Sequence, residues 1–193
     1  MSPPQSPLEP PYLFAFLRAV NLGQHNKVPM KPLIAALERQ GPPPTAYLLA
    51  SGNLVFGSTK RATKTLRGRL EGLIGDEFGV NTAVVLRTAA EVQAVLAANP
   101  FAVPLGGSVH VCLWNVDERV DEDARRALQA ADFGADSVAL DGAAAYLCFA
   151  AMSHTSRLSN QAIERRLGVT ATARNINTFE RLLQRWPPAE NSR

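Results

Sequence analysis

The sequence predicts an α+β protein made of two ferredoxin-like (α/β-plait) subdomains, each with the element order β-α-β-β-α-β. Short apolar runs of strand length alternate with longer stretches of helical spacing. This six-element order occurs twice within 193 residues, and a short helical stretch with a Gly-Gly joint separates the two copies. The hydrophobic fraction of 46% and the charged fraction of 19% are typical of a globular chain.

The first copy is predicted over residues 12–87. An apolar run at residues 12–20 has the length and aromatic content of a strand. Pro29 and Pro32 suit the first turn of the next helix, because a missing amide hydrogen costs little there, and this helix should stop at the Gly-Pro run of residues 41–44. The remaining elements are strands at residues 46–50 and 54–57 around Ser51-Gly52-Asn53, a helix ended by Gly79, and a strand at residues 82–87.

A connector helix and joint are predicted over residues 88–107. Thr88 and Glu91 have the spacing of a capping box, and Asn99-Pro100 should end the helix. The second copy, residues 108–186, repeats the order. Its strands are expected at residues 109–116, 137–140, 144–150 and 169–173, and its helices at residues 121–131, 159–167 and 178–185. Residues 1–11 should form a disordered Pro-rich tail, and residues 187–193 a second tail.

Composition narrows the function classes only slightly. The net charge of +3 permits an anionic partner without requiring one. Cys112 and Cys148 lie in apolar runs and are expected to be buried, reduced thiols. His110 shares a strand face with Cys112, but no CxxC or HxxxH spacing supports a metal site, so neither a metal nor a cofactor is expected.

No secretory signal is visible, and no apolar segment approaches the ~20 residues that a membrane helix needs. We therefore expect a cytoplasmic protein without a membrane partner. The sequence does not indicate an oligomeric state.

Polar residues gather on loops that the plait topology brings to one edge of each sheet. The loop after the first strand and the central hairpin turn should lie at the same end of the first sheet, beside a helix N-terminus that favours anions. In the second copy, the loop after the third strand and the end of the fourth strand should coincide. The candidate ligand-binding residues are Arg18, Asn21, Gly23, Asn26, Lys27, Ser51, Gly52, Asn53, Arg157, Arg174, Asn175 and Asn177.

The leading hypothesis is that both edges face one cleft that binds a small anionic or phosphate-bearing ligand. Each part also has a structural explanation. Asn175 or Asn177 can cap the last helix, and Asn53 can be a turn residue that tolerates positive φ. Arg18 can lie at a strand end with its aliphatic stem along apolar surface.

Two other functions have weaker support. Tyr12, Phe14, Phe16 and Arg18 share one parity on the first strand, so single-stranded nucleic acid could stack on an open sheet face, although no RNP1 pattern is present. An enzyme could use Lys27 or His25 as an acid–base group with Arg174 stabilising charge. No motif names a reaction, and no catalytic residue is assigned.

Four segments resemble the bacterial domain of unknown function 1697 family. They are LRAVNLGQHNKVPM (residues 17–30), LLASGNLVF (residues 48–56), LAANPF (residues 96–101) and TARNINT (residues 172–178). The resemblance implies two ferredoxin-like subdomains and brings no established activity. Its characteristic polar positions fall on the candidate residues given above, apart from Arg157. The chain departs from the family pattern at Gln24, Arg157 and Ile176, where glycine, lysine and tryptophan are common.

Overall fold

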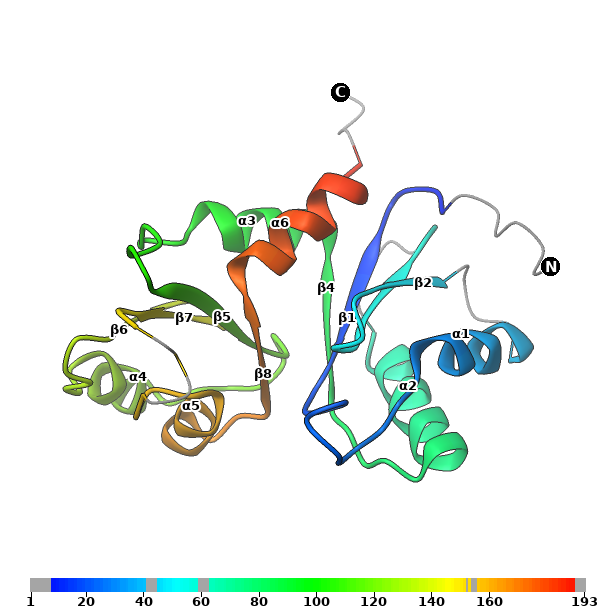
Figure 1. Ribbon diagram of the computed structural model, residues 1–193, viewed down its shortest axis with the longest axis horizontal. Helices are drawn as coiled ribbons and strands as arrows, with labels where there is room; N and C mark the ends of the chain where they lie inside the picture. Colours follow the sequence, from blue (N-terminus) through cyan, green and yellow to red (C-terminus); the bar gives the residue numbers. More distant parts are fainter. Residues whose placement is uncertain (1–7, 41–44, 59–62, 152, 154–155, 190–193) are drawn as a thin grey trace. The chain divides into compact units, whose positions relative to one another are not determined.

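The computed structural model describes residues 8–40, 45–58, 63–151, 153 and 156–189 (Figure 1). It contains two four-stranded antiparallel sheets, each combined with helices, so the predicted α+β class with two ferredoxin-like subdomains is confirmed. The predictions for residues 1–7, 41–44 and 190–193 fall outside the described residues.

The first sheet has the strand order β2-β3-β1-β4, and each neighbouring pair is antiparallel. This is the order that a plait with two right-handed crossovers gives. Its elements are β1 (Leu13–Leu17), α1 (Met30–Arg39), β2 (Thr45–Leu48), β3 (Asn53–Phe56), α2 (Lys64–Phe78) and β4 (Val84–Thr88).

The second sheet repeats this topology with the order β6-β7-β5-β8. The helix α3 (Ala89–Ala97) precedes it. Its own elements are β5 (Ser108–Trp114), α4 (Glu122–Gln129), β6 (Ser137–Asp141), β7 (Ala144–Phe149), α5 (Asn160–Leu167), β8 (Ala171–Asn175) and α6 (Ile176–Arg185).

The chain separates into two compact units. The first unit contains residues 1–93 and 182–193, and the second contains residues 94–181. The chain therefore passes from one unit to the other inside α3 and again inside α6. The end of α6 belongs to the first unit, although it follows the whole second unit in sequence.

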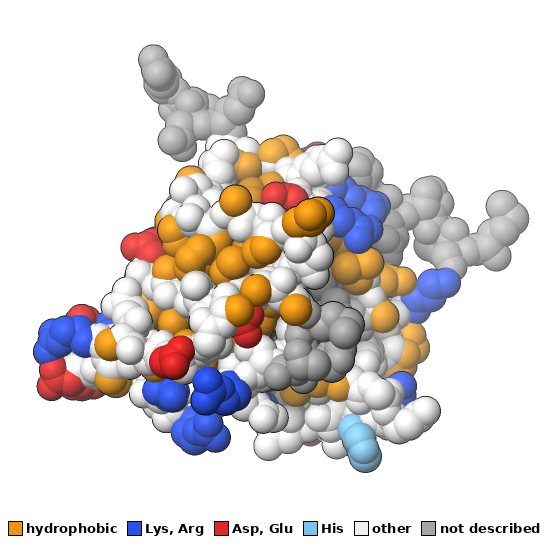
Figure 2. All heavy atoms as spheres, turned by 60° about the vertical axis from the view of Figure 1, so that its left-hand side comes forward, with side chains coloured by type: hydrophobic (Ala, Val, Ile, Leu, Met, Phe, Trp, Pro, Cys, Tyr) orange, Lys and Arg blue, Asp and Glu red, His pale blue; other side chains and the backbone are white. Residues whose placement is uncertain are grey.

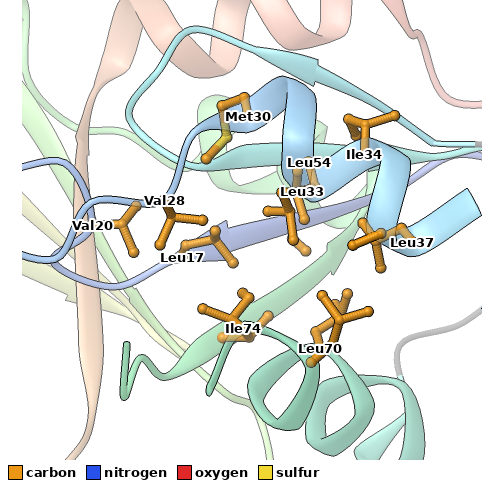
Figure 3. Close-up of a cluster of buried hydrophobic side chains, with 14 of the residues drawn as sticks. Leu17, Val20, Val28, Met30, Leu33, Ile34, Leu37, Leu54, Leu70 and Ile74 are labelled. Carbon is orange, nitrogen blue, oxygen red and sulfur yellow. The ribbon is translucent and has the colours of Figure 1, made fainter. Parts of the chain in front are cut away.

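The core of the first unit lies between its sheet and the helices α1 and α2 (Figure 3). All five residues of β1 are buried, and alternate ones, such as Leu17, face this core. Leu33 and Leu37 of α1 and Leu70 and Ile74 of α2 meet them at helical spacing. The second unit has the same arrangement, with Cys112 and Trp114 of β5 packed with residues of α4 and α5.

One local signal in the sequence acts as predicted. The backbone amide of Thr88 donates to Glu91 Oε2 (2.7 Å), and the Glu91 amide donates to Thr88 Oγ1 (3.2 Å), which is the predicted capping box of α3. At the start of α5, Ser159 Oγ accepts from the amide of Ala162 (3.2 Å), a cap that was not predicted, although the helix was expected to begin at this residue.

Several boundary predictions are wrong, and three of them concern candidate residues or the segments that carry them. β1 ends at Leu17, because Ala19 has a φ of 52° and leaves the extended conformation before residue 20. The fourth strand of the second unit is β8, shifted from residues 169–173 to Ala171–Asn175. Helix α6 begins at once with Ile176, so Arg174 and Asn175 lie in a strand and Asn177 in a helix.

The burial expected for the two cysteines is found for only one of them. Cys112 is buried, whereas Cys148 is half-buried.

Candidate functional site

The loop between β1 and α1, residues 18–29, has an unusual backbone. Ala19, Asn21, Gly23 and Asn26 all have φ between 49° and 56°. Residues other than glycine rarely adopt positive φ, so such a cluster persists only where other contacts hold it. Val20 and Val28 are among the buried residues that anchor this loop in the first core (Figure 3).

Asn21 joins this loop to the central hairpin turn. Its Nδ2 donates to the carbonyl of Val28 (2.8 Å) and to that of Ala50 (2.7 Å), while its Oδ1 accepts from the amide of Val28 (2.9 Å). The amide of Leu17 also donates to the carbonyl of Gly52 (2.8 Å). The expectation that the loop and the turn share one edge of the first sheet is therefore correct.

Asn26 and Lys27, near the end of this loop, differ in what their side chains contact. Asn26 Nδ2 donates to the carbonyl of Ala19 (3.1 Å), so this amide closes the loop on itself. Lys27 is exposed, and its Nζ donates to the carbonyl of Gly23 (2.6 Å). An ammonium has three donor hydrogens, and this hydrogen bond uses one of them. His25 is also exposed.

The hairpin turn is shaped by a close backbone approach at Gly52. Gly52 has a φ of 79°, and a Cβ there would lie 2.6 Å from Val20 Cγ2 and 2.8 Å from Leu17 Cβ. Asn53 is fully buried at the start of β3, where its Nδ2 donates to the carbonyl of Leu48 (2.8 Å) and to Ser51 Oγ (3.1 Å). The positive φ angles of this turn lie at Leu49 and Gly52, so the alternative role suggested for Asn53 is wrong.

The candidate residues of the first unit thus divide into two kinds. The side-chain amides of Asn21, Asn26 and Asn53 hold the backbone. Arg18 is half-buried; its amide donates to the carbonyl of Ala83 (2.9 Å), and its carbonyl accepts from Thr82 Oγ1 (2.7 Å). In contrast, the charged ammonium group of Lys27 belongs to an exposed residue at the loop edge of the first sheet.

Charge is distributed unevenly along the chain, and the net value of +3 conceals this. Between residues 10 and 70 only Glu38 is acidic, while Lys or Arg occupies nine positions. Helix α1 starts after Pro29 with no side-chain cap and no acidic residue in its first turn, which contains Lys31. Lys27, Lys31 and the partial positive charge of the α1 N-terminus therefore lie close together in sequence at the loop edge. Lys31 was not among the candidate residues predicted from the sequence, although the uneven distribution of charge points to it.

The candidate residues of the second unit are mostly structural. Asn175 Oδ1 accepts from the amide of Asn177 (3.0 Å), so Asn175 caps α6. Arg174 Nη1 donates to Thr172 Oγ1 (2.7 Å) and to the carbonyl of Ala173 (2.9 Å) along its own strand. Burial lowers the pKa of Arg174 to about 10, and the group still carries its charge at neutral pH.

Arg157 lies on the loop that follows β7, and its side chain is exposed. β7 and β8 both run antiparallel to β5, so they end at the same end of the second sheet, as predicted. The neighbouring Ser156 is held by hydrogen bonds, because its Oγ donates to the carboxylate of Asp136 and accepts from the amide of Leu158 (2.9 Å). The structure brings these residues to one sheet end without defining a shared contact.

The structure removes several alternatives. Phe14 and Phe16 are both 0% exposed, so they offer no stacking platform for nucleic acid. Within the described part of the chain, no group of three or more His, Cys, Asp and Glu side chains could hold a metal ion. Burial lowers the pKa of His110, whose ring packs edge-on against Phe149 at 5.2 Å between centroids. Burial also raises the pKa of Cys112.

Among the helices that the structure describes, none has both the length and the apolar character needed to cross a membrane. The surface nevertheless carries exposed hydrophobic side chains. Leu22 and Leu49 lie at the loop edge of the first unit, and Val103, Leu105 and Val116 are exposed in the second unit. Figure 2 shows hydrophobic side chains gathered on the face that is turned forward.

The fold and the charge pattern define a two-unit plait protein with a basic loop edge. A sequence profile described as "Protein of unknown function (DUF1697)" matches residues 12–146, and the chain belongs to this family. The match includes both segments of the loop edge and stops before Arg157 and Arg174.

The conserved bacterial protein SP0830 from Streptococcus pneumoniae has a similar structure. Its TM-score is 0.64 at 18% sequence identity, and the alignment covers 91% of this chain and 98% of that one. At this identity the likeness shows the fold alone. No curated protein sequence matches the chain.

Proposed function

We propose that the loop edge of the first unit binds a small anionic ligand, carrying a phosphate or a carboxylate group. The observation that supports this most directly is the pairing of an exposed lysine with a helix N-terminus at this edge. Lys27 is exposed there on a loop that side-chain hydrogen bonds hold, and the uncapped helix α1 begins three residues later at Met30. Anion sites usually combine fixed hydrogen-bond donors with positive charge, on a loop that a rigid scaffold positions.

The structural role of the asparagines supports the same proposal. Asn21 and Asn26 satisfy backbone carbonyl groups inside the loop, which leaves the ammonium of Lys27 at the surface. The side-chain amides of Asn21 and Asn26 therefore stabilise the loop conformation, and the Lys27 ammonium is not used for an ion pair inside the loop. The binding roles predicted for Arg157 and Arg174 stay predictions, and the present proposal is confined to the first unit.

Calorimetric titration with inorganic phosphate and with sulfate tests the proposal. We expect dissociation constants on the order of millimolar, as for a site with few charges near the surface. Replacing Lys27 by Gln should weaken binding about fivefold, because one charge at the edge is worth roughly 1 kcal/mol in high dielectric.

Lys64→Gln is the matched control. Lys64 begins α2 after β3, at the end of the sheet opposite the β1–α1 loop, and it is exposed as well. It should leave the affinity unchanged. Absence of any anion binding by the parent protein, or equal losses in both variants, would refute a site at this edge.

A further inference from the structure

We infer that the anion recognised at the loop edge carries an apolar body beside its charged group, such as a short alkyl phosphate. This inference rests on the proposed function, since it names the chemical class of ligand for the same site. The observation behind it is a pair of exposed leucines at the edge. Leu22 is 64% exposed and Leu49 is 40% exposed.

The two leucines occupy neighbouring positions in space. Leu22 follows Asn21, and Leu49 precedes Ala50, and the hydrogen bond from Asn21 Nδ2 to the carbonyl of Ala50 joins these residues at 2.7 Å. A single exposed leucine needs no explanation in a soluble protein. The two loop segments that carry the exposed leucines are therefore adjacent, and one ligand can contact both.

The backbone at Leu49 strengthens the functional interpretation. Leu49 has a φ of 63°, in the left-handed region where glycine or asparagine costs less. Its side chain remains 40% exposed, so burial offsets this backbone cost only in part. A turn selected only for stability would carry glycine or asparagine at this position, so the exposed leucine points to a contact outside the chain.

A cation lies beside the loop segment that carries Leu22. Lys27 Nζ is bound to the carbonyl of Gly23, the residue after Leu22, and the amide of His25 donates to the carbonyl of Leu22 (3.2 Å). None of the described exposed hydrophobic residues of the second unit, Val103, Leu105 and Val116, has a positive φ. A ligand that places its anion on Lys27 can lay its apolar part on Leu22 and Leu49.

The test is a calorimetric series of monomeric alkyl phosphates, from ethyl to hexyl, compared with inorganic phosphate. Full burial of a methylene group would improve affinity about fourfold, so partial burial on an open edge should improve it about twofold per methylene. The doubly substituted variant Leu22→Ser with Leu49→Asn should remove this dependence on chain length and leave the affinity for inorganic phosphate unchanged. Asparagine at position 49 tolerates the positive φ, so the turn is retained.

Leu105→Ser serves as the matched control, because Leu105 is fully exposed in the second unit. It should preserve the dependence on chain length. If inorganic phosphate binds but alkyl chains add nothing, this inference fails while the proposed function stands. If no phosphate binds, both fail. Binding to vesicles of phosphatidylcholine with phosphatidylglycerol, without binding of monomeric alkyl phosphates, would also overturn the inference in favour of a membrane surface.

Discussion

Asn21 shows how a polar residue in a candidate site can act through the backbone. Its side chain makes three hydrogen bonds that join the β1–α1 loop to the hairpin turn, and it adopts a φ of 56° that asparagine tolerates better than most residues. Each hydrogen bond contributes about 1 kcal/mol. We expect Asn21→Ala to lower the free energy of unfolding by about 3 kcal/mol, measured by urea denaturation.

Asn26→Ala provides the comparison. Asn26 has a φ of 49° but makes one side-chain hydrogen bond, at an exposed position. Its loss should cost about 1 kcal/mol. Equal effects of the two substitutions would show that Asn21 does not hold the two segments together.

At the residue scale, His110 should make the stability of the folded protein depend on pH. Burial lowers its pKa below the usual 6.5, so the folded state favours the neutral ring, while the unfolded state binds the proton more readily. This contribution to stability is present above pH 6.5 and is lost as the pH falls through that value toward the lower folded-state pKa. We expect the free energy of unfolding to decrease from about pH 7.5 to about pH 5.5. His110→Phe, which keeps a ring against Phe149, should show a smaller decrease; an identical one would exclude this cause.

At the scale of the element, the hairpin turn depends on the small size of Gly52. A Cβ at this position would clash with Val20 and Leu17, and both of these side chains belong to the buried core. Gly52→Ala should therefore cost about 3 kcal/mol of unfolding free energy, from overpacking and positive φ together. Gly23→Ala has a similar φ, but nothing lies within 4 Å of its Cβ, so it should cost about 1 kcal/mol. Chemical denaturation of both variants checks the difference.

Elements were predictable where one local signal decides them. The capping box at Thr88 was predicted from the sequence, because it acts over three residues. The early end of β1 could not be predicted, since the positive φ of Ala19 depends on contacts of the whole loop. The roles of Asn21 and Asn53 also escaped prediction, because hydrogen bonds to Ala50 and Leu48 are set by tertiary placement.

At the scale of the whole molecule, the topology followed from the sequence while the division of the chain did not. The two strand orders follow from the element order and the handedness of crossovers, so few arrangements had to be considered. The return of the end of α6 to the first unit depends on contacts between segments distant in sequence, which no local pattern reports. The second unit is therefore inserted into the first.

This division makes a prediction for the chain's two tryptophans. Trp186 is 5% exposed and belongs to the first unit, although residues 94–181 separate it from the rest of that unit. Trp114 is 1% exposed in the core of the second unit. Replacing a buried tryptophan by alanine costs about 3–5 kcal/mol, and the loss should appear first in the unit that contains the residue. In hydrogen–deuterium exchange, Trp186→Ala should raise exchange mainly in β1 to β4, and Trp114→Ala mainly in β5 to β8. The same pattern of exchange in both variants would mean that the chain opens as one cooperative body.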